Sequence, residues 1–525
     1  MSHPVLKLII LFFSLLLLFG CQEVRQPLPA RTGTDTTIVP SQIPAWMKVF
    51  KNPIPLHRGS SFYSLDDPFD AFAARLYLID HATTSIDVQY YIYKNDLTAA
   101  EFTYRLLQAA ERGVKVRLLV DDLSTSGRDR DIAYLAAHPN IDIKLFNPNH
   151  FRTLFRNMAM LLDVNTLGKR MHNKTFTVDG YASILGGRNI GDEYFAANND
   201  MQFVDYDILA VGKIVPKVYR SFDIYWNSPL AVSYEKLIKK HIEPEIYKKT
   251  IAHLTQLHRV FEKSRLASGV AHSTFMQDTR RGSIPLYGAQ NAALYFDLPK
   301  KVVSDQNDDT THLSKSLKGA IAQVHHELIV ISPYFIPSPE MMKSFQKLRE
   351  RNVTVIVVTN SLASTDVPLV YSGYRKYIKP LLKMGVELYE LKPSAHRTGN
   401  QKKKKKSSDR FSLHSKILLV DTSRMLVGSA NIDPRSDKLN TEVLMLIQGS
   451  PLIPHLKKGI KAVLNGHYFY RLTLQTSSRH SKRKSVVWTA KEAGKEKHYR
   501  SIPKAGTGRR IGTDLFSLLP IEGYL

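Results

Sequence analysis

Two short segments of the chain carry the same pattern of residues that can do chemistry. Each has a histidine and a lysine separated by one residue, an aspartate after four more residues, and a glycine-led tetrapeptide ending in asparagine after six more. A single His-x-Lys predicts nothing, whereas two copies with identical spacing predict a common role. The copies are His172-Asn173-Lys174, Asp179 and Gly186-Gly187-Arg188-Asn189, and His414-Ser415-Lys416, Asp421 and Gly428-Ser429-Ala430-Asn431.

Histidine, lysine and asparagine in this arrangement suit the transfer of a phosphodiester. One neutral imidazole can attack phosphorus to give a phosphohistidine, and the other, when protonated, can give its proton to the leaving alcohol. Lysine ammonium and asparagine amide groups can hold the non-bridging oxygens and stabilise the charge of the transition state. We expect one active site that uses both motifs and needs no metal and no cofactor, because lysine supplies the positive charge. Its expected members are His172, Lys174, Asn189, His414, Lys416 and Asn431.

A strand, a turn and a second strand are expected around each motif. Residues i and i+2 of a strand face the same side, so each histidine would point together with its lysine. Asp179 and Asp421 would close the first strand at a turn. The glycines that follow would let the backbone approach a bound group closely.

The elements that must carry these motifs occur in two similar passes along the chain. Each pass has helical spacing, a β-rich run, a second helix, buried strands and then a His-x-Lys segment. Strands that alternate with helices predict α/β layers in each half. We expect helices at 71–81, 99–112, 313–324 and 339–351, and strands at 85–93, 114–120, 141–146, 171–178, 328–336, 353–359, 386–391 and 413–420.

Length and charge add two further expectations. A chain of 525 residues exceeds what one core usually supports, so we expect lobes at 56–232 and 286–470, a helical connector at 233–285 and a basic C-terminal tail at 471–525. The 73 Lys and Arg against 47 Asp and Glu give a net charge of +26, which suits a polyanion, either nucleic acid or an anionic lipid surface.

The N-terminal residues predict a membrane anchor. The apolar run Leu8–Phe19 has the length of a signal-peptide core. Leu18-Phe19-Gly20-Cys21 resembles a bacterial lipobox, and Cys21 is the only cysteine, which excludes an intrachain disulfide. We expect a lipoprotein-type signal peptide at 1–20, lipidation of Cys21 and a tether at 21–55. An ordinary cleaved signal or a signal anchor is the alternative. The implied location is the bacterial cell envelope, and Gln22 resembles an outer-membrane sorting signal.

The paired motifs resemble those of the phospholipase D superfamily, over residues from about 56 to 465. The resemblance implies two similar α/β lobes, each a mixed β-sheet flanked by helices, related by a pseudo-twofold axis with one shared active site. It also implies that an acidic residue further along orients each catalytic histidine. The candidates are Glu442 in the second copy and Asp205 in the first, with Asp207 as a rival.

A narrower resemblance to bacterial cardiolipin synthases, closest to the C-type, is carried by three segments. It implies phosphatidyl transfer between phospholipids at an anionic phospholipid membrane, with phosphatidylglycerol as acceptor and phosphatidylethanolamine as a candidate donor. The lipobox departs from the transmembrane N-termini of better-known cardiolipin synthases, which leaves donor, acceptor and membrane side open. The segments are Asp87-Val88-Gln89-Tyr90-Tyr91-Ile92, Gly186-Gly187-Arg188-Asn189-Ile190-Gly191-Asp192-Glu193-Tyr194 and Asn431-Ile432-Asp433-Pro434-Arg435-Ser436.

Three other functions compete on the sequence alone. A phospholipase D that hydrolyses phospholipids would use the same motifs, with water in place of the acceptor alcohol. A nuclease of the superfamily cuts the same type of bond and would suit the positive charge. A membrane anchor concentrates an enzyme on lipid, however, so no nucleic acid is expected as a partner. A catalytically inactive scaffold would not need both motifs intact.

Overall fold

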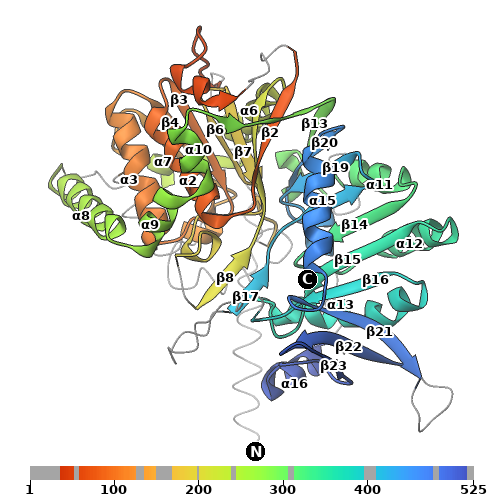
Figure 1. The fold of residues 1–525 in the computed structure, drawn as a ribbon. Helices are drawn as coiled ribbons and strands as arrows, with labels where there is room; N and C mark the ends of the chain where they lie inside the picture. The colour runs from red at the N-terminus through yellow and green to blue at the C-terminus, as the bar shows by residue number, and fades with distance from the viewer. Residues whose placement is uncertain are drawn as a thin grey trace, which may run out of the picture. The chain divides into compact units, whose positions relative to one another are not determined.

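The computed structural model describes residues 36–51, 58–125, 135–148, 168–197, 200–237, 244–305, 313–394, 410–476 and 484–516. The expected signal peptide, Cys21 and the polylysine run Lys402–Lys406 lie outside these ranges. Within them, no helix has the length and apolar character needed to cross a membrane. Two large mixed β-sheets with helices packed against them make up most of the described chain, which confirms the predicted α/β class (Figure 1).

The first sheet has nine strands among the described residues, in the order β10-β5-β4-β3-β6-β7-β9-β2-β12. Strands β3, β4 and β5 are parallel, and β6, β7, β9 and β2 continue from β3 as an antiparallel series. The strands are β2 (Ser60–Leu65), β3 (Ser85–Tyr90), β4 (Lys115–Asp121), β5 (Ile141–Phe146), β6 (Thr175–Val178), β7 (Ala182–Gly186), β9 (Asp207–Gly212), β10 (Ala231–Ser233) and β12 (Tyr287–Ala289).

The second sheet has ten strands in the described ranges, in the order β13-β20-β19-β18-β14-β15-β16-β21-β22-β23. Strands β14, β15 and β16 are parallel, and β18, β19, β20 and β13 continue from β14 as an antiparallel series. The strands are β13 (Asn291–Phe296), β14 (Glu327–Ile331), β15 (Thr354–Asn360), β16 (Glu387–Leu391), β18 (Ile417–Val420), β19 (Arg424–Gly428), β20 (Val443–Gln448), β21 (Phe469–Thr476), β22 (Lys484–Glu492) and β23 (Lys495–Tyr499).

Seven strands of each sheet share one topology. The order β5-β4-β3-β6-β7-β9-β2 in the first sheet corresponds to β16-β15-β14-β18-β19-β20-β13 in the second, with the same strand directions. The register also agrees, since Ile86 pairs with Val178 where Leu328 pairs with Val420. The predicted pair of similar lobes is therefore confirmed, and the two His-x-Lys motifs occupy equivalent places.

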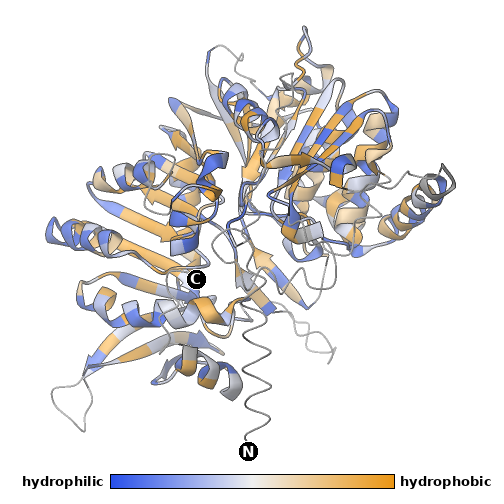
Figure 2. Ribbon diagram, turned by 180° about the vertical axis from the view of Figure 1, so that it is seen from behind, coloured by the Kyte–Doolittle hydropathy of each residue, from blue (hydrophilic) through white to orange (hydrophobic). Residues whose placement is uncertain are grey.

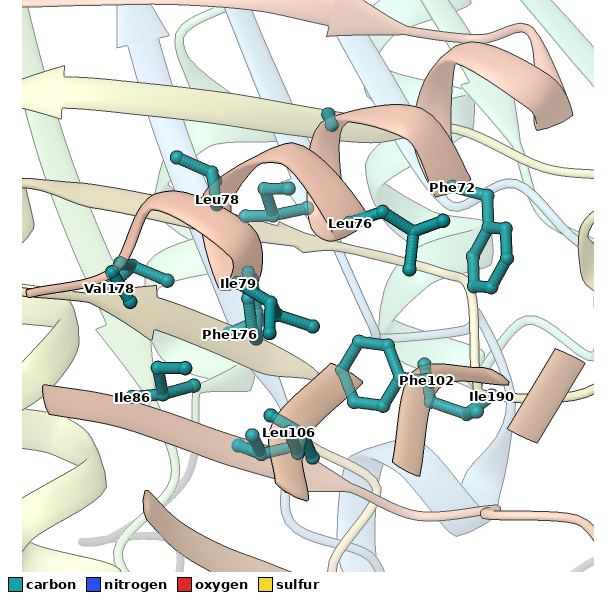
Figure 3. Close-up of a cluster of buried hydrophobic side chains, with 14 of the residues drawn as sticks. Phe72, Leu76, Leu78, Ile79, Ile86, Phe102, Leu106, Phe176, Val178 and Ile190 are labelled. Atoms are coloured by element: carbon teal, nitrogen blue, oxygen red, sulfur yellow. The ribbon is translucent and has the colours of Figure 1, made fainter. Parts of the chain in front are cut away.

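Helices cover the outer face of each sheet. The side chains of a strand alternate between its two faces, so every second residue packs against these helices. In β14, Leu328 and Val330 pack with the helices, whereas Ile329 and Ile331 point to the opposite face. The outer helices are α2 (Pro68–His81) and α3 (Leu97–Glu111) in the first lobe, and α11 (Ser314–Ala322), α12 (Pro339–Glu350) and α13 (Pro368–Lys383) in the second. Figure 3 shows the first of these cores, with Phe72, Leu76 and Ile79 of α2 facing Ile86, Phe102, Leu106, Phe176 and Val178.

The inner faces of the two sheets pack against each other. One buried apolar cluster joins Leu185 and Ile208 of the first sheet to Ile329, Leu419 and Met445 of the second. In Figure 2 the hydrophobic colour is concentrated on the strands, while the helices show both polar and apolar residues. This shared core fixes the two lobes in contact at β7, β9 and β19, the strands that lead away from the motifs.

An N-terminal arm, residues 36–51, packs along the first lobe, although these residues fall within the expected tether. Trp46 and Phe50 are buried in the first core, and β1 (Phe50–Lys51) pairs with β11 (Ile284–Pro285). Thr37 Oγ1 donates to the buried Asp87 carboxylate at 2.7 Å. The arm packs in this way because its two large aromatic side chains would be exposed to water in a free tether, whereas the core of the first lobe buries them.

The segment expected to be a helical connector contains four helices among its described residues, and all four pack on the first lobe, α7 against β5 and β10. Helix α8 lies against α3, and α9 and α10 lie against α2 (Figure 1). The four are α7 (Tyr234–Leu237), α8 (Pro244–Glu262), α9 (Arg265–His272) and α10 (Thr274–Arg280).

The chain after residue 470 differs from the expected basic tail. Strands β21, β22 and β23 extend the second sheet beyond β16, and helix α16 (Thr507–Phe516) packs against α13. The abundance of lysine and arginine hides a set of apolar residues that alternate with them. Of these, Leu472, Trp488 and Ala490 are buried in the second core.

Candidate active site

Both motifs lie in extended segments that precede a strand, rather than within the strand as expected. His172 and Lys174 come just before β6, and His414 and Lys416 lie between β17 (Arg410–Leu413) and β18. Each segment is held by the backbone of the other lobe. The N–H of His172 donates to the carbonyl of Thr441 at 2.9 Å, and the N–H of His414 donates to the carbonyl of Val204 at 2.8 Å.

The acidic residue that contacts each histidine comes from the opposite copy of the repeat. His172 Nδ1 lies 2.9 Å from the Glu442 carboxylate, and His414 Nδ1 lies 2.6 Å from Asp205 Oδ2. Glu442 directly follows Thr441, and Asp205 directly follows Val204, so the backbone pairing that holds each histidine also delivers its carboxylate. All four side chains are buried. Neither half therefore contains a complete histidine–carboxylate pair of its own.

Asp205 and Asp207, the two candidates in the first copy, lie in different places. The register of β7 with β9 and of β19 with β20 makes Asp205 the equivalent of Glu442. Asp207 instead forms a buried ion pair with Arg75 at 2.8 Å and lies 3.5 Å from Arg188. The geometry therefore places Asp205 beside the histidine and gives Asp207 a contact with two arginines.

Hydrogen bonds fix the Glu442 carboxylate in place. The hydroxyls of Ser429 and Ser436 both donate to it, the second at 2.7 Å. Its own backbone N–H donates to Asp297 Oδ2 at 2.9 Å. A carboxylate with this many partners can hold the imidazole of His172 in one orientation.

The two motif aspartates lie away from the histidines and close the turn after each first strand. Asp179 and Asp421 both have positive φ angles, of 52° and 54°. Asp179 accepts the backbone N–H groups of Thr84 and Ser85, at 2.7 and 3.0 Å. Asp421 accepts the corresponding N–H groups of 326 and 327, at 2.7 and 3.0 Å. Each side chain thereby satisfies amides at the start of the neighbouring strand, β3 or β14.

Lysine and asparagine complete the set, with one difference between the copies. Lys174 and Lys416 each donate to the carbonyl of the histidine two residues earlier. The side-chain amide of Asn189 donates to the Tyr194 hydroxyl at 2.8 Å and accepts from the N–H of residue 92 at 3.0 Å. Asn431 Oδ1 is buried without a hydrogen-bond partner in the described part of the chain. The second copy therefore keeps an unused polar atom in the site.

Burial sets the protonation of the site. It lowers the pKa of His172 to about 4, with Lys174 and Lys416 adding to the effect and Glu442 opposing it. Burial and Lys416 likewise lower the pKa of His414. Burial lowers the pKa of Lys416 to about 8 and that of Lys174 well below its usual value. A neutral imidazole is therefore favoured for His172 at neutral pH, and His414 takes up a proton less readily than a free histidine does.

The two carboxylates are held ionised. Burial alone would raise the pKa of Asp205, but His414 and Lys416 hold it at about 2. Burial opposes ionisation of Glu442 in the same way, yet His172 and Lys174 keep the pKa of that carboxyl below its usual value. A histidine that accepts a proton during reaction therefore meets a negative charge already in place.

Aromatic rings surround the histidines, and sequence reasoning did not assign them to the site. Tyr91 lies edge-on to His172 with ring centroids 4.9 Å apart. Tyr194 and Phe203 lie 5.2 and 4.9 Å from His414 by the same measure. Tyr91 and Tyr194 belong to segments that carry the narrower resemblance, which was the available signal. Among the described residues, no group of three or more His, Cys, Asp and Glu is placed to hold a metal ion.

Comparison with known proteins agrees with this geometry. A family model described as "Cardiolipin synthase, PLD-like domain" matches residues 76–226 and 317–464, one stretch in each lobe. The chain belongs to the phospholipase D superfamily. It is 33% identical over 477 residues to cardiolipin synthase C of Escherichia coli (strain K12), which covers 89% of this chain and 97% of the relative. Within the phospholipase D superfamily it is a phosphatidyltransferase of the cardiolipin synthase-like group.

Other phospholipase D relatives are similar to the chain at several levels. An uncharacterized protein of Helicobacter pylori is 33% identical over 522 residues, covering 98% of this chain and 99% of the relative. Cardiolipin synthase 1 of Bacillus cereus is 26% identical over 399 residues, covering 74% and 63%. The crystal structure of phosphatidylserine synthase from Haemophilus influenzae aligns with a TM-score of 0.54 at 14% identity, over 90% of this chain and 98% of that one. This last likeness concerns the fold.

Proposed function

We propose that this phosphatidyltransferase makes cardiolipin by moving a phosphatidyl group from one phospholipid to phosphatidylglycerol through a covalent phosphohistidine. The observation that carries the proposal is the exchange of carboxylates between the lobes. Glu442 contacts His172 at 2.9 Å and Asp205 contacts His414 at 2.6 Å. Two imidazoles, each with a fixed carboxylate, supply the nucleophile and the general acid that transfer requires.

In the first step His172 is the nucleophile. Its Nδ1 faces Glu442, which leaves Nε2 free to attack phosphorus. The bond from phosphorus to the head-group oxygen breaks, and His414, which enters the step protonated although burial lowers its pKa, gives its proton to that oxygen. The lowered pKa of His172 supports this assignment, because a neutral imidazole is available as a nucleophile. The short contact of His414 with Asp205 supports the acid role, because the carboxylate stabilises an imidazolium.

In the second step the head group leaves and an acceptor alcohol takes its place. The hydroxyl of phosphatidylglycerol gives its proton to His414, and its oxygen attacks phosphorus. The bond from phosphorus to His172 Nε2 breaks, and both histidines return to their starting states. Lys174, Lys416, Asn189 and Asn431 hold the non-bridging oxygens through both steps.

Transfer is favoured over hydrolysis by the burial of the histidines. His172 is 6% exposed and His414 is 4% exposed. A buried phosphohistidine is protected from bulk water. An acceptor that fits the site can therefore compete with water, although water is present at a far higher concentration. The donor is phosphatidylglycerol or phosphatidylethanolamine, and the site of action is an anionic membrane of the bacterial envelope to which lipidated Cys21 attaches the chain.

Lipid mass spectrometry tests this function. The full chain and a His172→Ala variant are expressed separately in a bacterium that lacks its own cardiolipin synthases. We expect cardiolipin in cells with the wild-type chain and none with the variant at equal protein levels. Phosphatidic acid without cardiolipin would show hydrolysis instead and contradict the proposal.

A further inference from the structure

The strand that leads to His414 carries polar atoms with no partner. Strand β17 runs from Arg410 to Leu413, and its alternation places Arg410, Ser412 and His414 on one face. Arg410 Nε and Ser412 Oγ are both buried without a hydrogen-bond partner in the described part of the chain. Buried polar atoms nearly always have a hydrogen-bond partner. Two such atoms without a partner, on the strand next to His414, therefore indicate a place where a ligand can bind.

A second arginine reaches the same place from the C-terminal helix. The Arg509 guanidinium, on α16, donates to the carbonyl of Leu362 at 3.0 Å and to that of Thr365 at 3.2 Å. Arg410 Nη2 donates to the same Thr365 carbonyl at 2.6 Å. Two guanidinium groups therefore share one acceptor on the loop that follows β15, and the charge of Arg509 adds to burial in lowering the pKa of Arg410.

This pair lacks the carboxylate that accompanies other arginines of the protein. Arg75, Arg117 and Arg105 all form ion pairs with aspartates or glutamates. Within the described ranges, neither Arg410 nor Arg509 has a carboxylate at ion-pair distance. Neighbouring Asp366 is engaged by the Tyr334 hydroxyl at 2.7 Å. Asp366 lies near enough to oppose the lowering of the Arg410 pKa, but burial and the charge of Arg509 outweigh it. Two close positive charges with no described carboxylate at ion-pair distance form a site that favours an anion.

We propose that Arg410 and Arg509 bind the phosphodiester that the acceptor lipid already carries, with the Ser412 hydroxyl as a further donor. This rests on the proposed function. Phosphatidylglycerol carries its own phosphodiester on the same glycerol as the attacking hydroxyl. That hydroxyl gives its proton to His414, which directly follows β17 and lies two residues after Ser412. The subsite therefore lies where the second phosphate of the acceptor arrives.

The C-terminal segment thereby has a role in acceptor choice. Helix α16 lies outside the seven-strand repeat and outside the residues matched by the family model. It brings Arg509 to the loop that follows β15 in the second lobe. The repeat supplies the chemistry common to both steps, and α16 supplies recognition of an acceptor that is itself a phospholipid.

Acceptor competition tests the subsite. The full chain, Arg509→Gln and Arg509→Lys are assayed in detergent micelles with one donor and with phosphatidylglycerol or glycerol as acceptor. We expect Arg509→Gln to raise KM for phosphatidylglycerol about tenfold or more, because a charge-assisted contact is lost, with kcat and transfer to glycerol unchanged. Arg509→Lys should lie between the two. Arg510→Gln is the matched control, because it removes the same charge from α16 and Arg510 donates to the distant Ile502 carbonyl.

Equal loss with both acceptors would overturn the inference, because Arg509 would then support the fold or the chemistry. Binding of glycerophosphoglycerol, the deacylated head group, is measured by calorimetry as an independent readout. It should bind the wild-type chain about tenfold more tightly than Arg509→Gln. Binding of inorganic phosphate alone at this site, or no binding, would also overturn it. A wild-type chain that binds the head group but makes no cardiolipin would contradict the proposed function and leave the subsite standing.

Discussion

The two carboxylates that face the histidines occupy equivalent positions but differ in length, and the residue opposite each differs to match. Asp205 is short and faces Gly187, where an added Cβ would lie 2.1 Å from Asp205 Oδ1. Glu442 is longer and faces Ser429, whose hydroxyl donates to it. Each copy has therefore fitted its own carboxylate to the histidine of the other copy. Substitutions of single carboxylates near the histidines should therefore affect turnover and the free energy of unfolding separately.

Asp205 and Asp207 give a matched pair for that separation. Asp205→Asn should lower turnover by about 10²- to 10⁴-fold with little change in the free energy of unfolding, because it removes the charge that orients His414. Asp207→Asn should instead lower the free energy of unfolding by about 3–5 kcal/mol, because it leaves the buried Arg75 unpaired. Turnover assays and urea denaturation measure the two effects. A reversal of the two phenotypes would exclude Asp205 as the residue that positions the histidine.

The pH dependence of kcat/KM should report Lys416. Burial lowers its pKa to about 8, so the ammonium is present below this pH and is lost as the pH rises through it. We expect kcat/KM to fall above about pH 8, while His172, with a pKa near 4, stays neutral through that range. In Lys416→Arg any remaining activity should persist to higher pH, because a guanidinium keeps its charge. A wild-type profile that is flat to pH 10 would contradict this assignment.

At the scale of elements, the N-terminal arm fastens the turn that ends the first motif. Trp46 Nε1 donates to Asp179 Oδ2 at 3.0 Å, and Tyr181 reaches the carbonyl of Pro40 at 3.5 Å. The first contact is buried and of normal length, whereas the second is at the limit of a hydrogen bond. The arm thus connects residues of the expected tether to the β6–β7 turn.

Trp46→Phe tests this connection. Removing the indole N–H should lower the free energy of unfolding by about 1–2 kcal/mol, because Asp179 loses one buried partner while the ring still packs. Tyr181→Phe is the control and should cost less than half as much. Chemical denaturation of both variants beside the wild type gives the comparison. Equal costs, or none for Trp46→Phe, would mean that the arm does not stabilise the turn.

The strands also show which parts of the fold the sequence could predict and which it could not. Strands such as β15 were found because they contain continuous apolar runs, and the repeat was found because the motif spacing recurs. Strands β2 and β13 were missed; each pairs with a strand far along the chain, and in β2 three serines dilute the apolar pattern. The pairing of Glu442 with His172 could not be predicted, because it depends on how the two inner sheet faces meet. The strands after residue 470 were hidden by the basic residues around them.

On the scale of the whole molecule, the expected anchor lies outside the described residues, and Cys21 remains the prediction to test. Cys21→Ser should abolish incorporation of labelled acyl chains into the protein, because no other cysteine is present. The variant should keep a weaker membrane binding that salt removes, since the net charge of +26 attracts anionic lipid. Metabolic labelling and membrane fractionation at two salt concentrations measure both. Labelling that persists in the variant would refute lipidation at this residue.

In the proposed mechanism the whole molecule is also the unit of catalysis, because each lobe supplies one histidine and the carboxylate that contacts the other. The most direct test compares His172→Ala, His414→Ala and the double variant in one transfer assay, with folding checked by circular dichroism. Each single variant should lose nearly all activity, about 10³-fold or more, and the double variant should be scarcely worse than either, because residues that act as a unit are not additive. If either single variant kept about half of the wild-type rate, the lobes would work as separate centres and the shared site would be wrong.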